Sequence, residues 1–303
     1  MSEFKAGAVT QSAAPMIGRL VVIGLGLIGG SFAKGLRERG LCREVVGVDL
    51  DPESRRMAVE LGVVDRCEER LAVACEGAEV IQLAVPILAM EKLLGQLAGL
   101  ELGDAVLTDV GSAKGNVVRA ARLAFVDKPV RFVPGHPIAG SEQSGVEAAN
   151  GELFRRHKVI LTPCERSDER ALALVDALWR ELGADVEQMQ VEHHDQVLAA
   201  TSHLPHLLAF GLVDSLAKRS ENLEIFRYAA GGFRDFTRIA SSSPEMWHDI
   251  VRANRGEVAG LLERQIGELQ ELLDLMRSED WPALKLRFAR ARAARERYLP
   301  HIE

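Results

Sequence analysis

The chain has 303 residues, of which 47% are hydrophobic and 27% are charged, and this length is sufficient for two folded domains. That composition excludes a disordered chain, a collagen-like chain and a coiled-coil rod. The formal net charge of −7 argues against a protein that works on nucleic acid or on an anionic membrane, since such proteins usually carry a basic surface.

The N-terminus gives no sign of export. Residues 1–16 are small and polar and lack the apolar core of a signal peptide, so a flexible N-terminal segment is predicted. The longest apolar run, 20–33, is interrupted by glycines and is too short to span a bilayer. The four cysteines form no Cys-x-x-Cys pair, which argues against a disulfide framework and a structural zinc site. These features predict a cytoplasmic protein that does not associate with membranes.

The first part of the chain, 17–188, alternates short apolar runs with amphipathic stretches. This alternation predicts βαβ units, with a parallel sheet covered by helices on both faces. The expected strands are 20–23, 45–48, 80–85, 105–109, 131–134 and 158–161. The expected helices between them include 113–125 and 168–182. The fold class is therefore α/β in this part of the chain.

After Met189 the strand signals stop, and an all-helical second domain is predicted over 189–303. Long helices are expected at 191–219, at about 244–277 and at 281–298. The first of these helices is apolar on several faces, and such a helix needs partners all round. A homodimer formed through the helical domain is therefore predicted. The basic side chains of the last helix are interpreted as a solvent-exposed face rather than a nucleic-acid site.

A glycine-rich turn separates the first expected strand from a helix. Gly24, Gly26 and Gly29 follow the pattern Gly-x-Gly-x-x-Gly. The first glycine permits a tight turn, the second lets the backbone approach a pyrophosphate, and the third allows close packing of helix on strand. The pattern predicts a dinucleotide-binding domain of the Rossmann type over 17–188.

Further residues are expected to complete this cofactor site. Leu27 and Ile28 lie at the start of the helix, where free N–H groups and the helix dipole attract phosphates. Asp49 ends the second strand, about 20 residues after the glycines, where a carboxylate binds a ribose hydroxyl. Its charge would repel the 2′-phosphate of NADP, so NAD is the predicted cofactor. Val85 and Pro86 close a later strand, where such folds line the cofactor.

Two polar clusters follow strands of the expected sheet. Ser112 comes just after the strand 105–109, at the carboxyl edge where open α/β folds bind ligands, although it is also a natural N-cap for the next helix. His136 lies between a glycine and a proline after the strand 131–134, at the same edge. A loop histidine in this position favours a functional role over a place in the core.

A third cluster lies in the helical half. His203 and His206 have the spacing of metal ligands, but Pro205 is expected to interrupt the helix and no cysteine or glutamate completes a ligand set. No metal site is therefore predicted. Arg234 and Arg238 lie one helical turn apart after a Gly-Gly pair, and their apolar neighbours favour a buried use over a surface salt bridge.

Five segments together resemble the prephenate dehydrogenase family, which includes the cyclohexadienyl and arogenate dehydrogenases. The segments are GLGLIGGS, DVGSAKG, HPIAGSE, SHLPH and GGFRDFTRIA, and the resemblance extends from about residue 20 to at least residue 247. It implies a Rossmann-type NAD domain followed by an all-helical dimerisation domain, in an oxidoreductase of tyrosine biosynthesis. The implied reaction is the oxidative decarboxylation of prephenate to 4-hydroxyphenylpyruvate, with hydride transfer from ring C4 to NAD. Some members carry a further C-terminal regulatory domain, which is not expected in a chain that ends at Glu303.

The resemblance also implies roles for particular residues. It matches His136 to the base that takes the proton of the C4 hydroxyl, and Ser112 to the residue that orients this hydroxyl. It matches Arg238 to the residue that binds a substrate carboxylate, and His206 to one near the substrate side chain. The implied second layer of the pocket consists of Ser202, Ser141, Glu142, Asp235 and Trp247.

Several alternatives stay open. Arogenate carries an ammonium group, for which Glu142 is the hypothesised partner, so arogenate, or both substrates, is an alternative to prephenate. Arg55 and Arg56 leave NADP open. A 3-hydroxy acid dehydrogenase is a more distant alternative, but such enzymes generally use a lysine base, and the helical half offers only Lys218 and Lys285, neither of them in a motif. A non-catalytic NAD sensor would leave the polar clusters unexplained.

Overall fold

The computed structural model describes residues 15–140, 143–220 and 222–298. The predicted flexible segment 1–16 lies outside the described residues except for its last two positions. Contacts between residues divide the chain into two compact units, Met1–Asn254 and Arg255–Glu303. The helices just after residue 188 belong to the first unit, in which Asp195 accepts hydrogen bonds from Lys114 N and Gly115 N. The domain boundary after residue 188 stays a prediction.

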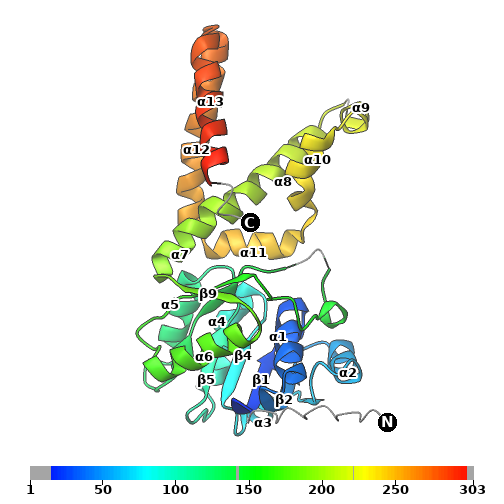
Figure 1. The fold of residues 1–303 in the computed structure, drawn as a ribbon, viewed down its shortest axis with the longest axis vertical. Helices are drawn as coiled ribbons and strands as arrows, with labels where there is room; N and C mark the ends of the chain where they lie inside the picture. The colour runs from blue at the N-terminus through cyan, green and yellow to red at the C-terminus, as the bar shows by residue number, and fades with distance from the viewer. Residues whose placement is uncertain (1–14, 141–142, 221, 299–303) are drawn as a thin grey trace, which may run out of the picture. The chain divides into compact units, whose positions relative to one another are not determined.

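Six parallel strands form the central sheet, in the order β3-β2-β1-β4-β5-β6 (Figure 1). The strands are β1 (Ile17–Ile23), β2 (Cys42–Val48), β3 (Arg66–Cys67), β4 (Val80–Leu83), β5 (Val106–Asp109) and β6 (Arg131–Val133). The order reverses between β1 and β4, and ligands of such sheets bind outside the carboxyl ends of the strands at this point. The predicted α/β fold of the Rossmann type is confirmed.

The two faces of this sheet carry separate apolar cores. Along β1, Leu20 and Val22 pack in the core that includes α1 and α6, whereas Val21 and Ile23 pack in the core that includes α4 and α5. Successive side chains of a strand point to opposite faces, so a continuous apolar run is what a doubly covered sheet requires. The helices and short turns of this part are α1 (Leu27–Glu38), α2 (Pro52–Glu60), α3 (Leu71–Cys75), η1 (Ile87–Ala89), α4 (Met90–Ala98), α5 (Gly115–Ala124), η2 (Val146–Ala148) and α6 (Glu169–Glu181).

A second, separate sheet contains three strands. It contains β7 (Gly135–Pro137), β8 (Lys158–Leu161) and β9 (Asp185–Gln188), with β7 antiparallel and β9 parallel to β8. The expectation that 158–161 joins the parallel sheet is therefore wrong. Pro134 follows β6 and has no N–H to continue a ladder, so the chain starts a new strand at Gly135. In that strand His136 pairs with Ile160.

The helical part of the first unit begins with one continuous helical stretch, Val191–Ala217. It consists of α7 (Val191–Leu198), a π-helical turn (Ala199–His203) and α8 (Leu204–Ala217). The predicted interruption at Pro205 is wrong, because this proline lies in the first turn of α8, where its missing N–H is tolerated after the wide π-helical turn. By length and composition alone, this stretch is the one in the described chain that could cross a bilayer. The shorter elements that follow are α9 (Asn222–Arg227), α10 (Gly231–Thr237), η4 (Arg238–Ser241) and α11 (Pro244–Ala253).

The second unit is a pair of helices, α12 (Arg255–Arg277) and α13 (Trp281–Tyr298). The helix expected over 244–277 is thus divided at Asn254. Arg287 of α13 joins the two helices by ion pairs to Glu268 and Glu271 of α12. The other basic residues of α13 are exposed, as the sequence predicts.

Candidate active site

The glycine-rich turn lies between β1 and α1, beside the end of β4. Gly24 has a φ of +98°, and a Cβ there would lie 2.3 Å from the carbonyl oxygen of Ala84. At Gly29 a Cβ would lie 2.1 Å from the carbonyl oxygen of Gly24. Gly26 differs, since a Cβ there would have no neighbour within 4 Å. Two glycines are thus required by packing, and the third leaves open space over the turn.

The N-terminus of α1 faces this open space without a capping side chain. Gly26 is the N-cap residue, and no described side chain hydrogen-bonds the first turn of the helix, where Leu27 and Ile28 lie. A helix N-terminus with free N–H groups attracts phosphate. Val85 and Pro86 follow β4 directly, and the Gly24 Cβ would lie 3.1 Å from the Val85 nitrogen. The residues present therefore fit a dinucleotide pyrophosphate.

Asp49 follows β2 at the same edge of the sheet. Its Oδ2 accepts a hydrogen bond from Leu25 N at 2.8 Å, and its Oδ1 accepts one from Asp51 N at 2.9 Å. Each carboxylate oxygen has a second lone pair, so the carboxylate is fixed in place and can still accept from ribose hydroxyls. Leu50 beside it is 97% exposed.

The two arginines that leave NADP open are both engaged elsewhere. Arg55 donates to the carbonyl oxygen of Asp49 at 2.8 Å and forms an ion pair with Glu69 at 2.5 Å. Arg56 pairs with two glutamates of its own helix. Both guanidinium groups already have carboxylate partners, which favours NAD over NADP.

His136 is the middle residue of β7, an edge strand of the second sheet, and is only 8% exposed. Its Nδ1 lies 2.9 Å from Nε2 of His194, at the start of the helical part. Burial lowers the pKa of His136 well below its ordinary value, with smaller contributions from the charges of His194, Lys114 and His203. The imidazole is therefore neutral at physiological pH and able to accept a proton.

Asp195 joins this pair to α5. Its Oδ1 lies 2.9 Å from Nδ1 of His194, and its carboxylate accepts hydrogen bonds from Lys114 N at 2.7 Å and Gly115 N at 2.8 Å. Asp195 thus caps α5. The alternative role of Ser112 as the N-cap is wrong, and its hydroxyl has no partner among the described residues.

A buried ion pair stabilises the same region. Lys114 Nζ lies 2.5 Å from Asp109 Oδ2, and both side chains are fully buried. Lys114 also donates to the carbonyl oxygen of Gly135 at 2.6 Å, next to His136. Burial lowers the pKa of Lys114, and the Asp109 carboxylate opposes this change. The pair connects the end of β5, the start of α5 and the start of β7.

The two histidines of the helical part have different surroundings. His203 is buried, with its Nδ1 3.3 Å from Asn254 Nδ2, and it hydrogen-bonds the backbone of Ser112. Burial lowers its pKa to about 4. His206 stacks on Trp247, with ring centroids 3.5 Å apart, and its Nδ1 lies 2.9 Å from the carbonyl oxygen of Ser202. His203 is therefore interpreted as a structural residue. The His206 ring, in contrast, is fixed by its stacking on Trp247, which covers one of its faces.

Arg238 lies close to this stacked pair. Burial lowers the pKa of His206, and the positive charge of Arg238 adds to the effect. Arg234, Asp235 and Arg238 are nevertheless exposed in the single chain, so the expected buried use of the arginines is not seen there. Neither α10 nor η4 buries any of its residues, so the apolar neighbours in these two elements do not cover the three side chains. Two predicted pocket residues, Ser141 and Glu142, lie outside the described residues.

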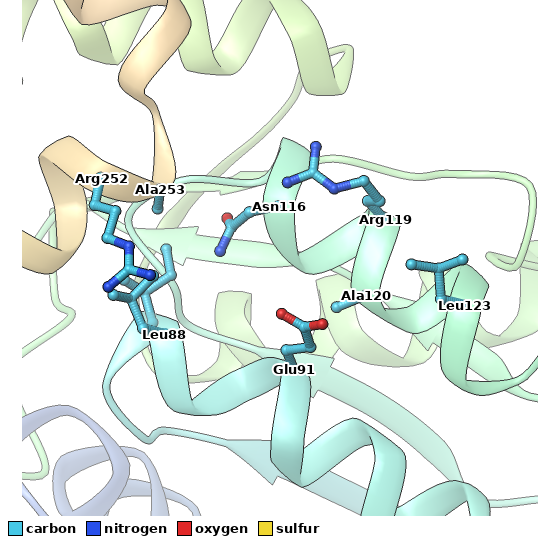
Figure 2. Close-up of a pocket in the computed structure, with 9 residues that line it drawn as sticks. Leu88, Glu91, Asn116, Arg119, Ala120, Leu123, Arg252 and Ala253 are labelled. Atoms are coloured by element: carbon cyan, nitrogen blue, oxygen red, sulfur yellow. The ribbon is translucent and has the colours of Figure 1, made fainter.

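A separate surface pocket of about 220 Å³ lies between η1, α4, α5 and α11 (Figure 2). Glu91, Arg119 and Arg252 line it, and all three are exposed. None of the predicted site residues lines this pocket. The polar clusters, in contrast, meet where the second sheet, α5 and the π-helical turn come together.

Two family models match the chain in succession. The nucleotide-binding domain of prephenate dehydrogenase matches residues 32–188, and the dimerization domain of prephenate dehydrogenase matches residues 190–290. The chain belongs to the prephenate dehydrogenase family. The predicted family is confirmed, and with it the prediction that the chain is an oxidoreductase of this family.

Curated relatives in the prephenate dehydrogenase family match most of the chain. The cyclohexadienyl dehydrogenase of Zymomonas mobilis is 36% identical over 282 residues, which cover 91% of this chain and 94% of that protein. The prephenate dehydrogenase of Bacillus subtilis is 38% identical over 266 residues, covering 86% and 71%.

Solved structures of the family match the fold. Prephenate dehydrogenase from Aquifex aeolicus, in complex with hydroxyphenyl propionate and NAD+, has a TM-score of 0.85 and 37% identity, and the match covers 92% of this chain and 98% of that chain. Arogenate dehydrogenase from Synechocystis has a TM-score of 0.79 and 29% identity, covering 92% and 99%.

Within this prephenate dehydrogenase fold, sequence analysis missed four residues that surround His136. These are Asp109, Lys114, His194 and Asp195. The first two stand inside the segment DVGSAKG, which already pointed to Ser112. His194 and Asp195 stand together at the start of the helical part. A histidine–aspartate pair at the beginning of a helix is the signal that could have found them.

Proposed function

We propose that this enzyme oxidises prephenate to 4-hydroxyphenylpyruvate with NAD and with loss of carbon dioxide. One observation carries the proposal: His136 is buried, neutral and held at Nδ1 by His194, while its Nε2 has no partner among the described residues. A base in this state can accept the proton of an alcohol while the carbon that bears the hydroxyl is oxidised.

The cofactor is NAD, as the sequence predicts. The matched family model is a nucleotide-binding domain, and the Aquifex aeolicus relative was solved with NAD+. When bound, NAD supplies the hydride acceptor for the reaction. The residues of this chain that would hold it are those of the glycine-rich turn, with Asp49 for the ribose and Val85 and Pro86 beside the turn.

In the proposed reaction His136 Nε2 takes the proton of the C4 hydroxyl, and Ser112 orients that hydroxyl. The hydrogen on C4 leaves with its electron pair as hydride. NAD would accept this hydride. The bond between the ring and its carboxylate breaks, the carboxylate leaves as carbon dioxide, and the bonding pair enters the ring, which becomes aromatic. The oxygen on C4 takes the proton back from His136, which gives the hydroxyl of the product and restores the neutral base. Aromatisation supplies much of the driving force, so the protein mainly aligns the reacting groups.

The substrate end of the site is proposed to lie at His206, Arg238 and Trp247. The stacked pair of His206 and Trp247 supports this placement, since it offers a flat surface beside a guanidinium. Arg238 is proposed to bind a substrate carboxylate, for which a planar guanidinium is well suited. Ser202, which holds His206, and Asp235 are proposed as supporting residues, together with Ser141 and Glu142.

Product analysis tests the proposed reaction. Prephenate and NAD are incubated with the enzyme, and NADH, carbon dioxide and 4-hydroxyphenylpyruvate are quantified. Equal amounts of the three are expected. A second arm with arogenate tests the alternative substrate, for which Glu142 remains the proposed partner of the ammonium group. NADH without carbon dioxide would contradict the proposal and indicate a simple alcohol dehydrogenase.

Replacement of Arg238 by alanine is expected to raise KM for prephenate about 10- to 100-fold, with a smaller loss of kcat, because a charged hydrogen bond to a carboxylate is lost. Steady-state kinetics at saturating NAD measure both constants. Arg234→Ala, one turn earlier and also exposed, is the control and should change KM little. Equal losses of kcat and kcat/KM in Arg238→Ala would contradict the assignment, since they place the interaction in the transition state alone.

Replacement of Asp49 by asparagine is expected to weaken NADH binding about 5- to 10-fold and to strengthen NADPH binding, since the amide keeps the shape but loses the charge. Fluorescence titration with NADH and NADPH measures both dissociation constants. Asp51→Asn is the matched control, because that carboxylate caps α2 through Glu53 N and Ser54 N. If both cofactors changed in parallel, Asp49 would not be the residue that discriminates between them.

We further propose that the enzyme is a homodimer formed through its helical part. Helix α8 is strongly apolar, yet only its Leu204 and Ala209 are buried. A helix that exposes several apolar faces requires a partner. The match to a dimerization domain supports this proposal. Light scattering coupled to size-exclusion chromatography should give twice the monomer mass; a monomer would contradict it.

A cytoplasmic location, with no nucleic-acid or membrane partner, is proposed with the dimer. All four cysteines are free, and two of them, Cys42 and Cys75, are buried. Free thiols fit a reducing compartment. In the dimer the apolar faces of 191–217 would be covered by protein rather than lipid. Fractionation of cells that express the protein should place it in the soluble fraction.

A further inference from the structure

We propose that His194 and Asp195 are positioning residues that keep His136 in the tautomer with Nδ1 protonated and Nε2 free. The inference rests on the proposed function for its catalytic meaning, but the tautomer itself can be observed without turnover. Three groups form a line from α5 to the second sheet: Asp195 Oδ1 lies 2.9 Å from His194 Nδ1, and His194 Nε2 lies 2.9 Å from His136 Nδ1.

The direction of this line is set at Asp195. Its carboxylate accepts hydrogen bonds from Lys114 N and Gly115 N, at the positive end of α5. Burial acts to raise the pKa of Asp195, but the hydrogen bonds from His194 and from these two N–H groups lower it on balance. The carboxylate is therefore ionised and can only accept. It follows that His194 Nδ1 carries a proton and donates it to Asp195.

The next step follows from the chemistry of a neutral imidazole. His194 is completely buried, and burial lowers its pKa despite the opposing effect of Asp195. A neutral ring with Nδ1 protonated has an unprotonated Nε2, which must act as an acceptor. The only hydrogen bond then compatible with the 2.9 Å separation is donation from His136 Nδ1 to His194 Nε2. His136 Nε2 is consequently left with its lone pair.

The arrangement also stabilises the charge that His136 acquires. When Nε2 takes the substrate proton, the ring becomes an imidazolium whose Nδ1–H points, through His194, to an ionised carboxylate. The groups whose charges would oppose this protonation are His194 on α7, Lys114 just before α5 and His203 on the π-helical turn. Asp109 on β5 neutralises Lys114, and His203, with a pKa of about 4, is uncharged at neutral pH. Asp195 is therefore the counter-charge for the protonated base.

A carboxylate that orients a histidine through its far nitrogen is a recurring device of catalytic sites. Here a second histidine lies between them, and the carboxylate is held by a helix N-terminus. Asp195 also has a structural role as the cap of α5, so its removal would confuse two effects. The variants below therefore keep the size of each side chain close to that of the wild-type residue and change its charge or its hydrogen-bonding groups.

The first test is the tautomer of His136, measured by nitrogen NMR of protein labelled with ¹⁵N-histidine, with the signal assigned by its loss in His136→Asn. We expect a protonated Nδ1 and an unprotonated Nε2 in the wild-type enzyme at neutral pH. The opposite tautomer would overturn the proposal. This measurement needs no substrate, so it separates failure of the proposal from failure of the proposed function.

The second test removes the negative charge at the start of the line. Asp195 Oδ1 faces both His194 Nδ1 and Lys114 N, whereas Oδ2 faces only Gly115 N, so the amide oxygen of Asp195→Asn keeps two hydrogen bonds when it lies at the Oδ1 position. The His136 tautomer is then retained, but the imidazolium formed in the reaction loses its counter-charge. Turnover is expected to fall about 10- to 100-fold, with KM for prephenate and the Kd for NADH little changed. Wild-type turnover in this variant would overturn the role proposed for Asp195.

The third test uses a matched pair at His194. In His194→Gln the amide oxygen can accept from His136 while its NH₂ donates to Asp195, so the direction is kept; in His194→Leu both hydrogen bonds are lost. The glutamine variant should retain at least about 10-fold more turnover than the leucine variant. The pH at which the rate falls on the acid side should change in the leucine variant, which leaves the His136 Nδ1 unpaired. Equal turnover of the two variants, with wild-type pH profiles, would overturn the proposal.

Discussion

Replacement of His136 by asparagine is expected to lower turnover about 10²- to 10⁴-fold while NADH binding persists. Asparagine can hydrogen-bond the substrate hydroxyl but cannot take its proton. The loss should appear in kcat, because saturating prephenate cannot replace the missing base. Steady-state kinetics give kcat, and fluorescence titration gives the dissociation constant of NADH.

The control for this variant is His157→Asn. His157 is exposed and has its Nδ1 3.2 Å from the carbonyl oxygen of Arg155, away from the polar clusters. It should retain wild-type kinetics. A turnover for His136→Asn within a few-fold of the wild-type value would remove His136 as the base.

Replacement of Lys114 by methionine is expected to lower the free energy of unfolding by about 3–5 kcal/mol. Lys114 and Asp109 are both fully buried, and methionine leaves the Asp109 carboxylate without its counter-charge. The carbonyl oxygen of Gly135 also loses a donor. Denaturant unfolding followed by circular dichroism, at fixed protein and NAD concentrations, measures the loss.

A matched surface variant separates burial from loss of a lysine. Lys158 pairs with Glu187, but its side chain is 51% exposed, so Lys158→Met should cost less than about 1 kcal/mol. Adding Asp109→Leu to Lys114→Met should restore part of the stability, since the unpaired charge is removed. If Lys114→Met and Lys158→Met lowered the free energy of unfolding equally, the ion pair of Lys114 and Asp109 would not be a special source of stability.

The cofactor half of the site could be predicted from the sequence because its residues are close together along the chain. Gly24, Gly26 and Gly29 form one turn, and Asp49 follows the next strand, so local geometry is sufficient. His136 and Ser112 could also be placed at the sheet edge, since each directly follows a strand. The parallel order of the main sheet follows from the same alternation of strands and helices.

The residues that the sequence did not reveal are brought to the site by contacts between distant segments of the chain. His194 is 58 positions from His136, and Asp195 is 81 positions from Lys114, so no local pattern connects them. The same contact explains one wrong expectation, because Asp195 caps α5 in place of Ser112. The wrong expectation at Pro205 has a local cause, because the π-helical turn just before this proline accommodates it.

The central claim is that this chain oxidises prephenate at His136, and the initial rate of NADH formation from NAD and prephenate tests it most directly. The rate is followed by the near-ultraviolet absorbance of NADH, with the wild-type enzyme and His136→Asn compared at the same protein concentration. The account predicts rapid NADH formation by the wild-type enzyme and a rate about 10²- to 10⁴-fold lower in the variant. No NADH from the wild-type enzyme, or equal rates in the two proteins, would contradict it.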